Sequence, residues 1–284
     1  MSWPLVMALA RLHPQSRIIV VTQHSKGALA EAALQVESAD VEHGWHAVYS
    51  PDAEPSEPVM RLLSGAHSIY SFVSNPGDVT TSNLARLAGP EAQVVTLEPR
   101  PPADFQKHAS DFLLQQLNGR SALLAGTQQM IKSINLRGIS AGRSDGGDIV
   151  IHPGSGSVEK CWPVDRFIKL IGKFKRKKKN VRVLLGEVEL ERMAAKDVAA
   201  LEASAQVRRP ANYVDLLNEL RTAATAIAND SGPAHLAGMI GVPTVVLFGA
   251  SNPIVWRPLG PRVKVIAKSA MDQIEVDEVF ESAI

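Results

Sequence analysis

A strand, loop, helix, turn and second strand follow one another in residues 224–253, ATAIANDSGPAHLAGMIGVPTVVLFGASNP. The apolar run 224–228 and the β-branched run 244–248 have the length and composition of buried strands. Between them Pro233 suits the first turn of a helix, and Gly241 suits the residue just after its end. This βαβ pattern predicts an α/β fold built on parallel sheets.

The same alternation of short apolar runs and helical patterns continues through the rest of the chain. In the second half we predict strands at 149–152, 181–185, 224–228, 244–248 and 263–266, with a weaker one at 205–208. In the first half we predict strands at 17–22, 46–49, 68–73 and 93–97, and helices at 4–10 and 104–117.

A segment rich in Gly and Ser separates the two halves. Residues 138–148 read GISAGRSDGGD, which is typical of an exposed linker. We therefore predict an N-terminal Rossmann-like domain over 1–140 and a C-terminal ligand-binding domain over 148–284. The second half has enough strands for one doubly wound sheet, in which ligands bind beyond the carboxyl ends of the strands.

Composition excludes several classes of protein. The chain has 284 residues, 30 Lys plus Arg and 29 Asp plus Glu, so no overall positive charge favours nucleic acid. Its single cysteine, Cys161, excludes an internal disulfide and a cysteine-based zinc site, and a reducing cytoplasm is expected. No apolar run approaches the roughly 18 residues of a membrane span.

The first loop with chemistry follows the strand predicted at 149–152. It reads HPGSGS over 152–157, and Lys160 comes soon after. Two glycines, two hydroxyls and a lysine are typical of a phosphate-binding loop, although the spacing fits neither a Walker A loop nor a dinucleotide fingerprint. A simple Gly/Ser turn that caps the helix beginning near Pro163 is the alternative.

The second loop follows the strand at 224–228. Ser231 or Asp230 suits the helix cap, so that Gly232, Ala234 and His235 point free N–H groups outward and form an anion site. The Asp230 carboxylate accepts sugar hydroxyls or only caps the helix. His235 is either a catalytic residue or a partly buried histidine with ordinary hydrogen-bond partners.

These stretches together resemble the C-terminal domain of glycosyltransferase family nine, the ADP-heptose:lipopolysaccharide heptosyltransferases. The resemblance rests on four segments: HPGSGSVEKCWPVDRF (152–167), LLGEVELE (184–191), NDSGPAHLAGMIGVPTVVLFGASNP (229–253) and WRPLG (256–260). It implies a GT-B fold, in which two Rossmann-like doubly wound domains face a cleft. It also implies that the second domain holds a nucleotide-diphosphate sugar and the first holds the saccharide or lipid-linked saccharide acceptor.

The resemblance further implies an inverting, metal-independent transfer of a heptose or related sugar, without a cofactor, in the cytoplasm. Lys160 and the hydroxyl loop would contact the donor phosphates, Asp230 would face the sugar, and Glu187 or Glu189 would hold the ribose. The adenine would lie near 209–213. The donor-binding residues expected in this way are Ser155, Gly156, Ser157, Lys160, Glu187, Glu189, Asp230, Ser231, Gly232, Ala234 and His235.

The beginning of the chain departs from the family pattern. Family members open with a strand and a Gly-Asp loop whose carboxylate is taken as the general base, whereas this chain starts inside the following helix, at Met1. Three hypotheses follow. The natural protein is longer and active; or it is a weak or inactive nucleotide-sugar-binding homologue; or Asp78 replaces the base, although Asp78 also suits a helix cap.

Two further alternatives stay open. The run 173–179, KFKRKKK, carries six positive charges at a helix end, either as a solvated face that suits the helix dipole or as a contact with an anionic inner-membrane surface. A different GT-B-like enzyme, for example a sugar-nucleotide epimerase, is a rival that the form of the second loop disfavours. Trp162 is expected to be a packing anchor and Cys161 a small buried residue.

Overall fold

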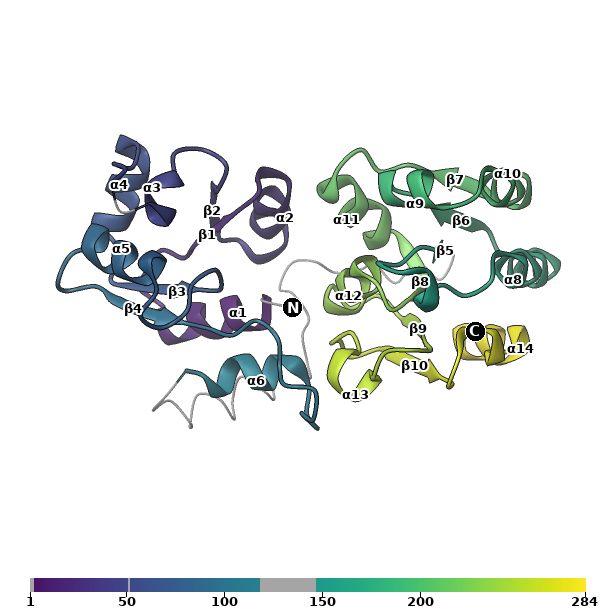
Figure 1. The fold of residues 1–284 in the computed structure, drawn as a ribbon. Coiled ribbons are helices and arrows are strands. Elements are labelled where there is room, and N and C mark those ends of the chain that lie inside the picture. Colours follow the sequence, from purple (N-terminus) through teal and green to yellow (C-terminus); the bar gives the residue numbers. More distant parts are fainter. Residues whose placement is uncertain (1–2, 51, 118–146) are drawn as a thin grey trace. The chain divides into compact units, whose positions relative to one another are not determined.

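The computed structural model describes residues 3–50, 52–117 and 147–284. The chain divides into two compact units, Met1–Ala125 and Gly126–Ile284, and each contains parallel strands and helices (Figure 1). The predicted linker lies outside the described residues up to residue 146, so the domain bounds drawn from it remain a prediction.

One six-stranded parallel sheet forms the centre of the second unit. Its order is β10-β9-β8-β5-β6-β7. Strands β6 and β7 follow β5 on one side of the sheet, and β8, β9 and β10 follow one another on its other side. The point between β5 and β8 is therefore the topological switch point, where doubly wound sheets bind ligands. The strands are β5 (Asp148–His152), β6 (Val181–Leu184), β7 (Gln206–Arg208), β8 (Ala223–Asn229), β9 (Thr244–Phe248) and β10 (Val263–Ala267).

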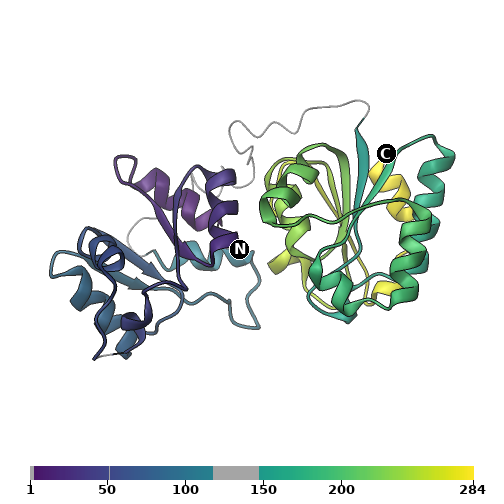
Figure 2. The ribbon, with the colours of Figure 1, turned by 90° about the horizontal axis from the view of Figure 1, so that it is seen from above.

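Helices cover both faces of this sheet. Figure 2 shows α11 and α12 on one face and α8, α10 and α14 on the other. The helices of the unit are α8 (Val164–Arg176), α9 (Glu187–Arg192), α10 (Ala195–Ser204), α11 (Tyr213–Arg221), α12 (Gly232–Met239), α13 (Pro253–Trp256) and α14 (Val276–Ala283), with 3-10 turns η1 (Val158–Lys160) and η2 (Met271–Gln273).

The larger hydrophobic cluster of the second unit lies between the sheet and helices α8 and α14, and a smaller one includes Ala234 of α12. Trp162 is 1% exposed, packs edge to face on Phe167 with ring centroids 4.8 Å apart, and donates from Nε1 to the Ile274 carbonyl. The expected packing role of Trp162 is thus confirmed. All six strands predicted in this half are present, with bounds shifted by no more than one residue. The four inner strands are covered on both faces, so their sequences form mainly apolar runs.

The first unit has two separate parallel pairs in its described part, β1-β2 and β3-β4. Its elements are α1 (Trp3–Leu12), β1 (Ile19–Thr22), α2 (His24–Leu34), β2 (Glu37–Asp40), α3 (His46–Tyr49), α4 (Glu57–Ser64), β3 (Ser68–Ser71), α5 (Val79–Ala88), β4 (Gln93–Thr96) and α6 (Ala109–Gln115). The strands predicted at 17–22, 68–73 and 93–97 are confirmed.

The strand predicted at 46–49 is wrong, because these residues form helix α3. Trp45 and Val48 lie three residues apart, which puts both on one helical face, and both are buried in a cluster with Leu84 and Leu87 of α5. Packing against α5 therefore overrides the strand propensity of a short β-branched and aromatic run.

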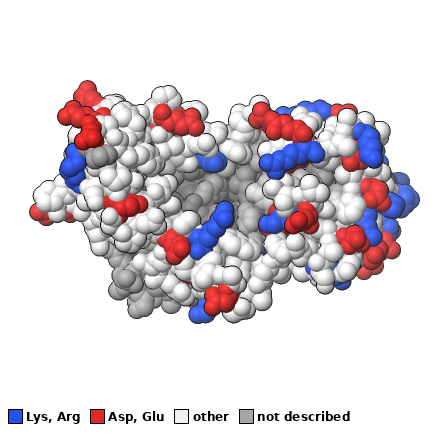
Figure 3. All heavy atoms as spheres, viewed as in Figure 1, with Lys and Arg blue, Asp and Glu red and all other residues white. Residues whose placement is uncertain are grey.

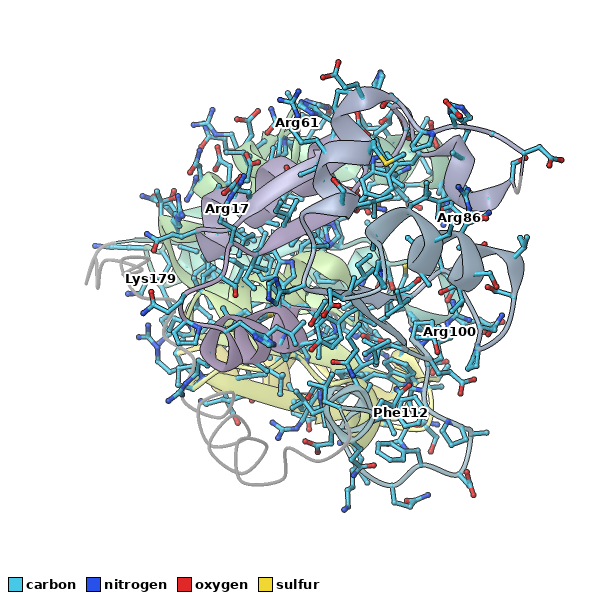
Figure 4. All side chains as sticks on the ribbon, turned by 90° about the vertical axis from the view of Figure 1, so that its left-hand side faces the viewer. Arg17, Arg61, Arg86, Arg100, Phe112 and Lys179 are labelled. Atoms are coloured by element: carbon cyan, nitrogen blue, oxygen red, sulfur yellow. The ribbon has the colours of Figure 1, made fainter. Side chains whose placement is uncertain are left out.

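Strand β2 was not predicted, because its sequence ESAD is polar. It pairs with β1 in register Ile19 to Glu37, and the Glu31 carboxylate accepts from the backbone N–H and the hydroxyl of Ser38. Arg17, which lies just before β1 and is labelled in Figure 4, also donates to the carboxylate of Glu37 at the start of β2. Side-chain hydrogen bonds, and not an alternation of apolar residues, thus accompany the formation of β2.

Charged side chains are distributed without a dominant sign. On the face drawn in Figure 3, Lys and Arg are interspersed with Asp and Glu, which agrees with a formal net charge of +1. No helix in the described ranges is both long and apolar enough to cross a bilayer.

Candidate functional site

Two loops meet at the switch point of the second unit's sheet. Strands β5 and β8 are hydrogen-bonded neighbours, with His152 paired to Ala228, so the residues that follow each strand emerge side by side at the carboxyl edge. Side chains from both segments join the loop after β5, residues 153–157, to residues 229–231 at the end of β8.

Asn229 is the buried link between the loops. It is fully buried, its Nδ2 donates to the Pro153 carbonyl at 2.6 Å, and its Oδ1 accepts from the Trp162 N–H at 3.1 Å. Because a buried amide must satisfy both ends, these bonds fix the path of loop 153–157 relative to β8.

Asp230 collects a second set of contacts. Lys160 Nζ lies 2.8 Å from Asp230 Oδ2, and Ser251 Oγ donates to the same oxygen at 2.6 Å. Ser155 Oγ donates to the Asp230 backbone carbonyl at 2.7 Å. The side chain of Lys160 remains 35% exposed while that of Asp230 is 7% exposed, so the ammonium faces the solvent side of a buried carboxylate.

Helix α12 begins beside this ion pair. Ser231 is its N-cap residue, although its side chain makes no capping bond, and Asp230 is not the cap. The prediction that His235 has a free N–H is wrong, because this group donates to the Ser231 carbonyl and closes the first helical bond. The first-turn N–H groups of Gly232 and Ala234 precede that bond, so they have no acceptor within the helix.

His235 lies in the first turn of α12, and Gly241 follows its last turn. His235 Nε2 lies 3.9 Å from Asp230 Oδ1, and its side chain is 22% exposed, so it is neither deeply buried nor remote from the site. Gly241 follows the helix with φ of +81°, a left-handed conformation that favours glycine. The predicted helix end is confirmed.

The two acidic candidates after β6 differ in their surroundings. Glu187 is exposed at the first position of α9, whereas Glu189 is 7% exposed. Glu189 Oε2 accepts from the Gly186 N–H at 2.8 Å, and Oε1 lies 3.4 Å from His152 Nε2. Burial raises the pKa of Glu189, but the hydrogen bond and charge of His152 together with backbone N–H groups outweigh it, so the pKa lies below its ordinary value.

The remaining loop residues are accessible. Gly156 and Ser157 are exposed, and Arg192 Nη1 donates to the Gly156 carbonyl at 3.0 Å. Cys161 is only half-buried rather than buried as expected, and its thiol lies 3.4 Å from the Ser157 carbonyl. Burial raises the pKa of this thiol, so it is mainly protonated near neutral pH.

Asp78, the candidate base in the first unit, caps helix α5. Its Oδ1 accepts from the Thr81 N–H and its Oδ2 from the Asn75 N–H, both at 2.7 Å. These two backbone bonds lower the pKa of Asp78 below its ordinary value. A general base that works near neutral pH needs the opposite shift.

Three residues of this site were not singled out from the sequence: His152, Asn229 and Ser251. Asn229 could have been found as a polar residue directly after an apolar strand at a switch point. Ser251 and the His152–Glu189 pair depend on contacts between distant segments. The structure's described residues contain no group of three or more His, Cys, Asp or Glu side chains that could hold a metal ion.

Comparison with known proteins assigns the family. Residues 109–281, more than half of the chain, match the family model described as glycosyltransferase family 9 (heptosyltransferase). The chain belongs to glycosyltransferase family 9. This family 9 chain is 28% identical over 119 residues to lipopolysaccharide heptosyltransferase 3 of Escherichia coli strain K12, and the match covers 39% of the chain and 33% of that protein. It thus spans about one third of that curated relative.

Three solved structures of glycosyltransferases have a similar fold. The family 9 glycosyl transferase from Veillonella parvula DSM 2008 gives a TM-score of 0.71 at 18% identity over 99% of this chain and 91% of that one. The E. coli ADP-heptose lps heptosyltransferase II gives 0.71 at 17% identity over 99% and 92%. E. coli heptosyltransferase WaaC with ADP gives 0.64 at 16% identity over 98% and 93%. The α/β fold is therefore of the GT-B class, as predicted.

Proposed function

We propose that this family 9 chain is a glycosyltransferase that transfers a heptose or related sugar from a nucleotide-diphosphate sugar, ADP-heptose first among them, to a lipopolysaccharide-type saccharide. Family membership supports the reaction class. The names of its relatives, a lipopolysaccharide heptosyltransferase and a heptosyltransferase with ADP, support the choice of acceptor and donor.

One observation carries the proposal: the two loops converge at the switch point. Lys160 Nζ reaches across from the first loop to within 2.8 Å of Asp230, directly before helix α12. The partly exposed Lys160 ammonium thus lies beside the residue that comes just before the N-cap of α12, and the N–H groups of Gly232 and Ala234 belong to the first turn of that helix. This combination is suited to a diphosphate.

The chemistry of transfer fits these groups. The acceptor hydroxyl oxygen forms a bond to the anomeric carbon and gives up its proton to a base or to solvent. The bond from that carbon to the diphosphate oxygen breaks at the same time, which inverts the configuration. Negative charge grows on the leaving diphosphate. Lys160 has three donors, so it can bind phosphate oxygens and retain Asp230, and the N–H groups add fixed dipoles. We propose that this arrangement works without a metal.

We assign the ribose to Glu187 rather than Glu189. Glu187 is exposed just after β6, the strand next to β5, and its carboxylate is available to ribose hydroxyls. Glu189 is buried and already bonded to Gly186 and His152. Asp230 remains the carboxylate nearest the phosphate-binding groups and is assigned to the donor sugar.

Calorimetry with ADP, UDP and GDP tests the donor, followed by a product assay with ADP-heptose and a lipopolysaccharide acceptor. The proposal predicts binding of ADP above the other two, and product formation. A chain that binds none of the three nucleotides would contradict the proposal. Binding without product would instead support a nucleotide-sugar-binding homologue of low activity.

We also propose that the basic end of α8 contacts an anionic lipid surface. Lys173 pairs with Asp277, but no ion pair within the described ranges involves the cations at 175–179. Lys175, Lys178 and Lys179 line a cavity of about 620 Å³ at the amino edge of the sheet, and Lys179 lies at the outer edge of the view in Figure 4. Clustered lysines around a hollow suit phosphate headgroups.

Sedimentation with vesicles tests this contact. The chain should sediment with vesicles that contain anionic lipid, and a variant with Lys175, Lys178 and Lys179 changed to Gln should not. Inorganic phosphate in excess separates a lipid headgroup from a soluble phosphate as the occupant. Equal sedimentation of both proteins would contradict a membrane role and leave a solvated helix end.

A further inference from the structure

His152 and Glu189 form a buried pair beneath the first loop. Their side chains are 9% and 8% exposed, and His152 Nε2 lies 3.4 Å from Glu189 Oε1. The other imidazole nitrogen, Nδ1, lies 3.5 Å from the hydroxyl of Ser231, the N-cap residue of α12. The pair therefore connects α9, the end of β5 and the start of α12.

The carboxylate of Glu189 also supports the loop backbone. A Cβ on Gly154 would lie only 1.9 Å from Glu189 Oε1, so only glycine lets the loop lie directly on this carboxylate. Arg192, one turn further along α9, donates to the Gly156 carbonyl at 3.0 Å. Helix α9 thus holds loop 153–157 at two points.

Asn229 and Asp230, at the end of β8, hold the opposite side of the loop. Asn229 donates to the Pro153 carbonyl, and Ser155 donates to the Asp230 carbonyl. Loop 153–157 is therefore fixed between α9 and this segment. A displacement of Glu189 would be transmitted to the loop backbone, because closely packed atoms leave little room to adjust.

We propose that Glu189 and His152 are positioning residues that act through loop 153–157, and that Glu189 does not touch the donor. The proposal rests on the proposed function, since it takes loop 153–157 to bind the diphosphate. A buried carboxylate that keeps an imidazole partner and a backbone N–H is expensive to neutralise, because the remaining partner is left without its bond. Groups that orient a binding site in this way commonly change its affinity about 10-fold or more.

The test uses the full chain with Glu189→Gln and, as a matched control on the same helix, Glu191→Gln, which changes an exposed residue. Hydrogen exchange of the loop amides is measured without any ligand. Affinity is then measured by calorimetry for ADP and, separately, for inorganic pyrophosphate, which has no ribose. His152→Gln removes the His152–Glu189 pair but leaves the hydrogen bond from the Gly186 N–H to Glu189. It replaces Glu189→Gln as the test variant if Glu189→Gln fails to fold.

Positioning predicts that Glu189→Gln raises exchange at 154–161 several-fold and weakens ADP and pyrophosphate by the same factor, about 10-fold. The double variant with His152→Gln should be no weaker than the worse single variant. Loss of affinity for ADP alone would show a direct ribose contact and overturn the proposal, as would unchanged loop exchange. A wild-type chain that binds neither ligand would refute the proposed function, and the exchange measurement would still decide the role of the pair.

Discussion

The four inner strands of the second unit, β5, β6, β8 and β9, are buried along most of their length. The edge strands β7 and β10 and the strands of the first unit are mostly half-buried or exposed. Every residue of β6 and β9 is buried, but none of the four residues of β1 is. In the second unit each inner strand has a strand on either side and helices over both faces. In the described part of the first unit each strand has one neighbour. A continuous ladder, more than apolar composition, therefore decides how much a strand buries.

The largest expected effect is on the free energy of unfolding, and it compares a buried isoleucine of the second unit with a half-buried isoleucine of the first. Ile227 lies fully buried in β8, and Ile19 lies half-buried in β1. Ile227→Ala should lower the free energy of unfolding of its unit by about 3–5 kcal/mol, because it leaves a cavity, whereas Ile19→Ala should cost roughly 1–2 kcal/mol. Urea unfolding, with hydrogen exchange to report each unit separately, measures both. Equal losses of unfolding free energy would contradict the difference between the two units.

The next largest effect is on affinity for ADP at the candidate site, all of whose residues belong to the second unit with its continuous sheet. Lys160→Met should weaken binding of ADP roughly 10- to 100-fold, because a hydrogen bond to a charged group is worth about 1.5–3 kcal/mol. Lys169→Met is the matched control, since Lys169 is exposed and pairs with Asp165 on α8. Calorimetry compares the three proteins. Unchanged affinity in Lys160→Met would remove the lysine from the donor site.

A smaller effect is expected in the first unit, at Asp78. Asp78→Ala should lower the melting temperature of this unit by a few degrees, because it removes the cap of α5, while Asp78→Asn should retain the cap and the stability. Thermal unfolding measures this, and a transfer assay on the Asn variant decides the other role. Loss of transfer with intact stability and donor affinity would make Asp78 the base.

The smallest effect is a pH dependence at Glu189. The pKa of this carboxyl is lowered in the folded chain, so its contribution to stability is present above the ordinary glutamate pKa of about 4.3 and is lost as the pH falls through the lower folded value. The difference in unfolding free energy between wild type and Glu189→Gln should therefore shrink in acid. Urea unfolding between pH 7 and pH 3 measures it, and a constant difference would contradict an ionised Glu189.

The sequence predicts the second unit far better than the first. Its four inner strands are mainly apolar runs, and each of the six predicted strands is confirmed. In the first unit the run 46–49 has strand composition yet forms a helix, and ESAD at β2 has no strand pattern at all. Both errors arise where tertiary packing or side-chain hydrogen bonds outweigh a weak local preference.

The sequence alone determined which loops are candidates for phosphate binding, because glycines, hydroxyls, a lysine and a helix start are local properties of residues 152–160 and 229–235. Only the tertiary structure decided how these residues are used. It placed Asp230 between Lys160 and Ser251, put Glu189 under Gly154 and left Glu187 exposed. The physical reason is that a hydrogen bond between residues tens of positions apart depends on strand order, and strand order is set by the burial of the whole sheet.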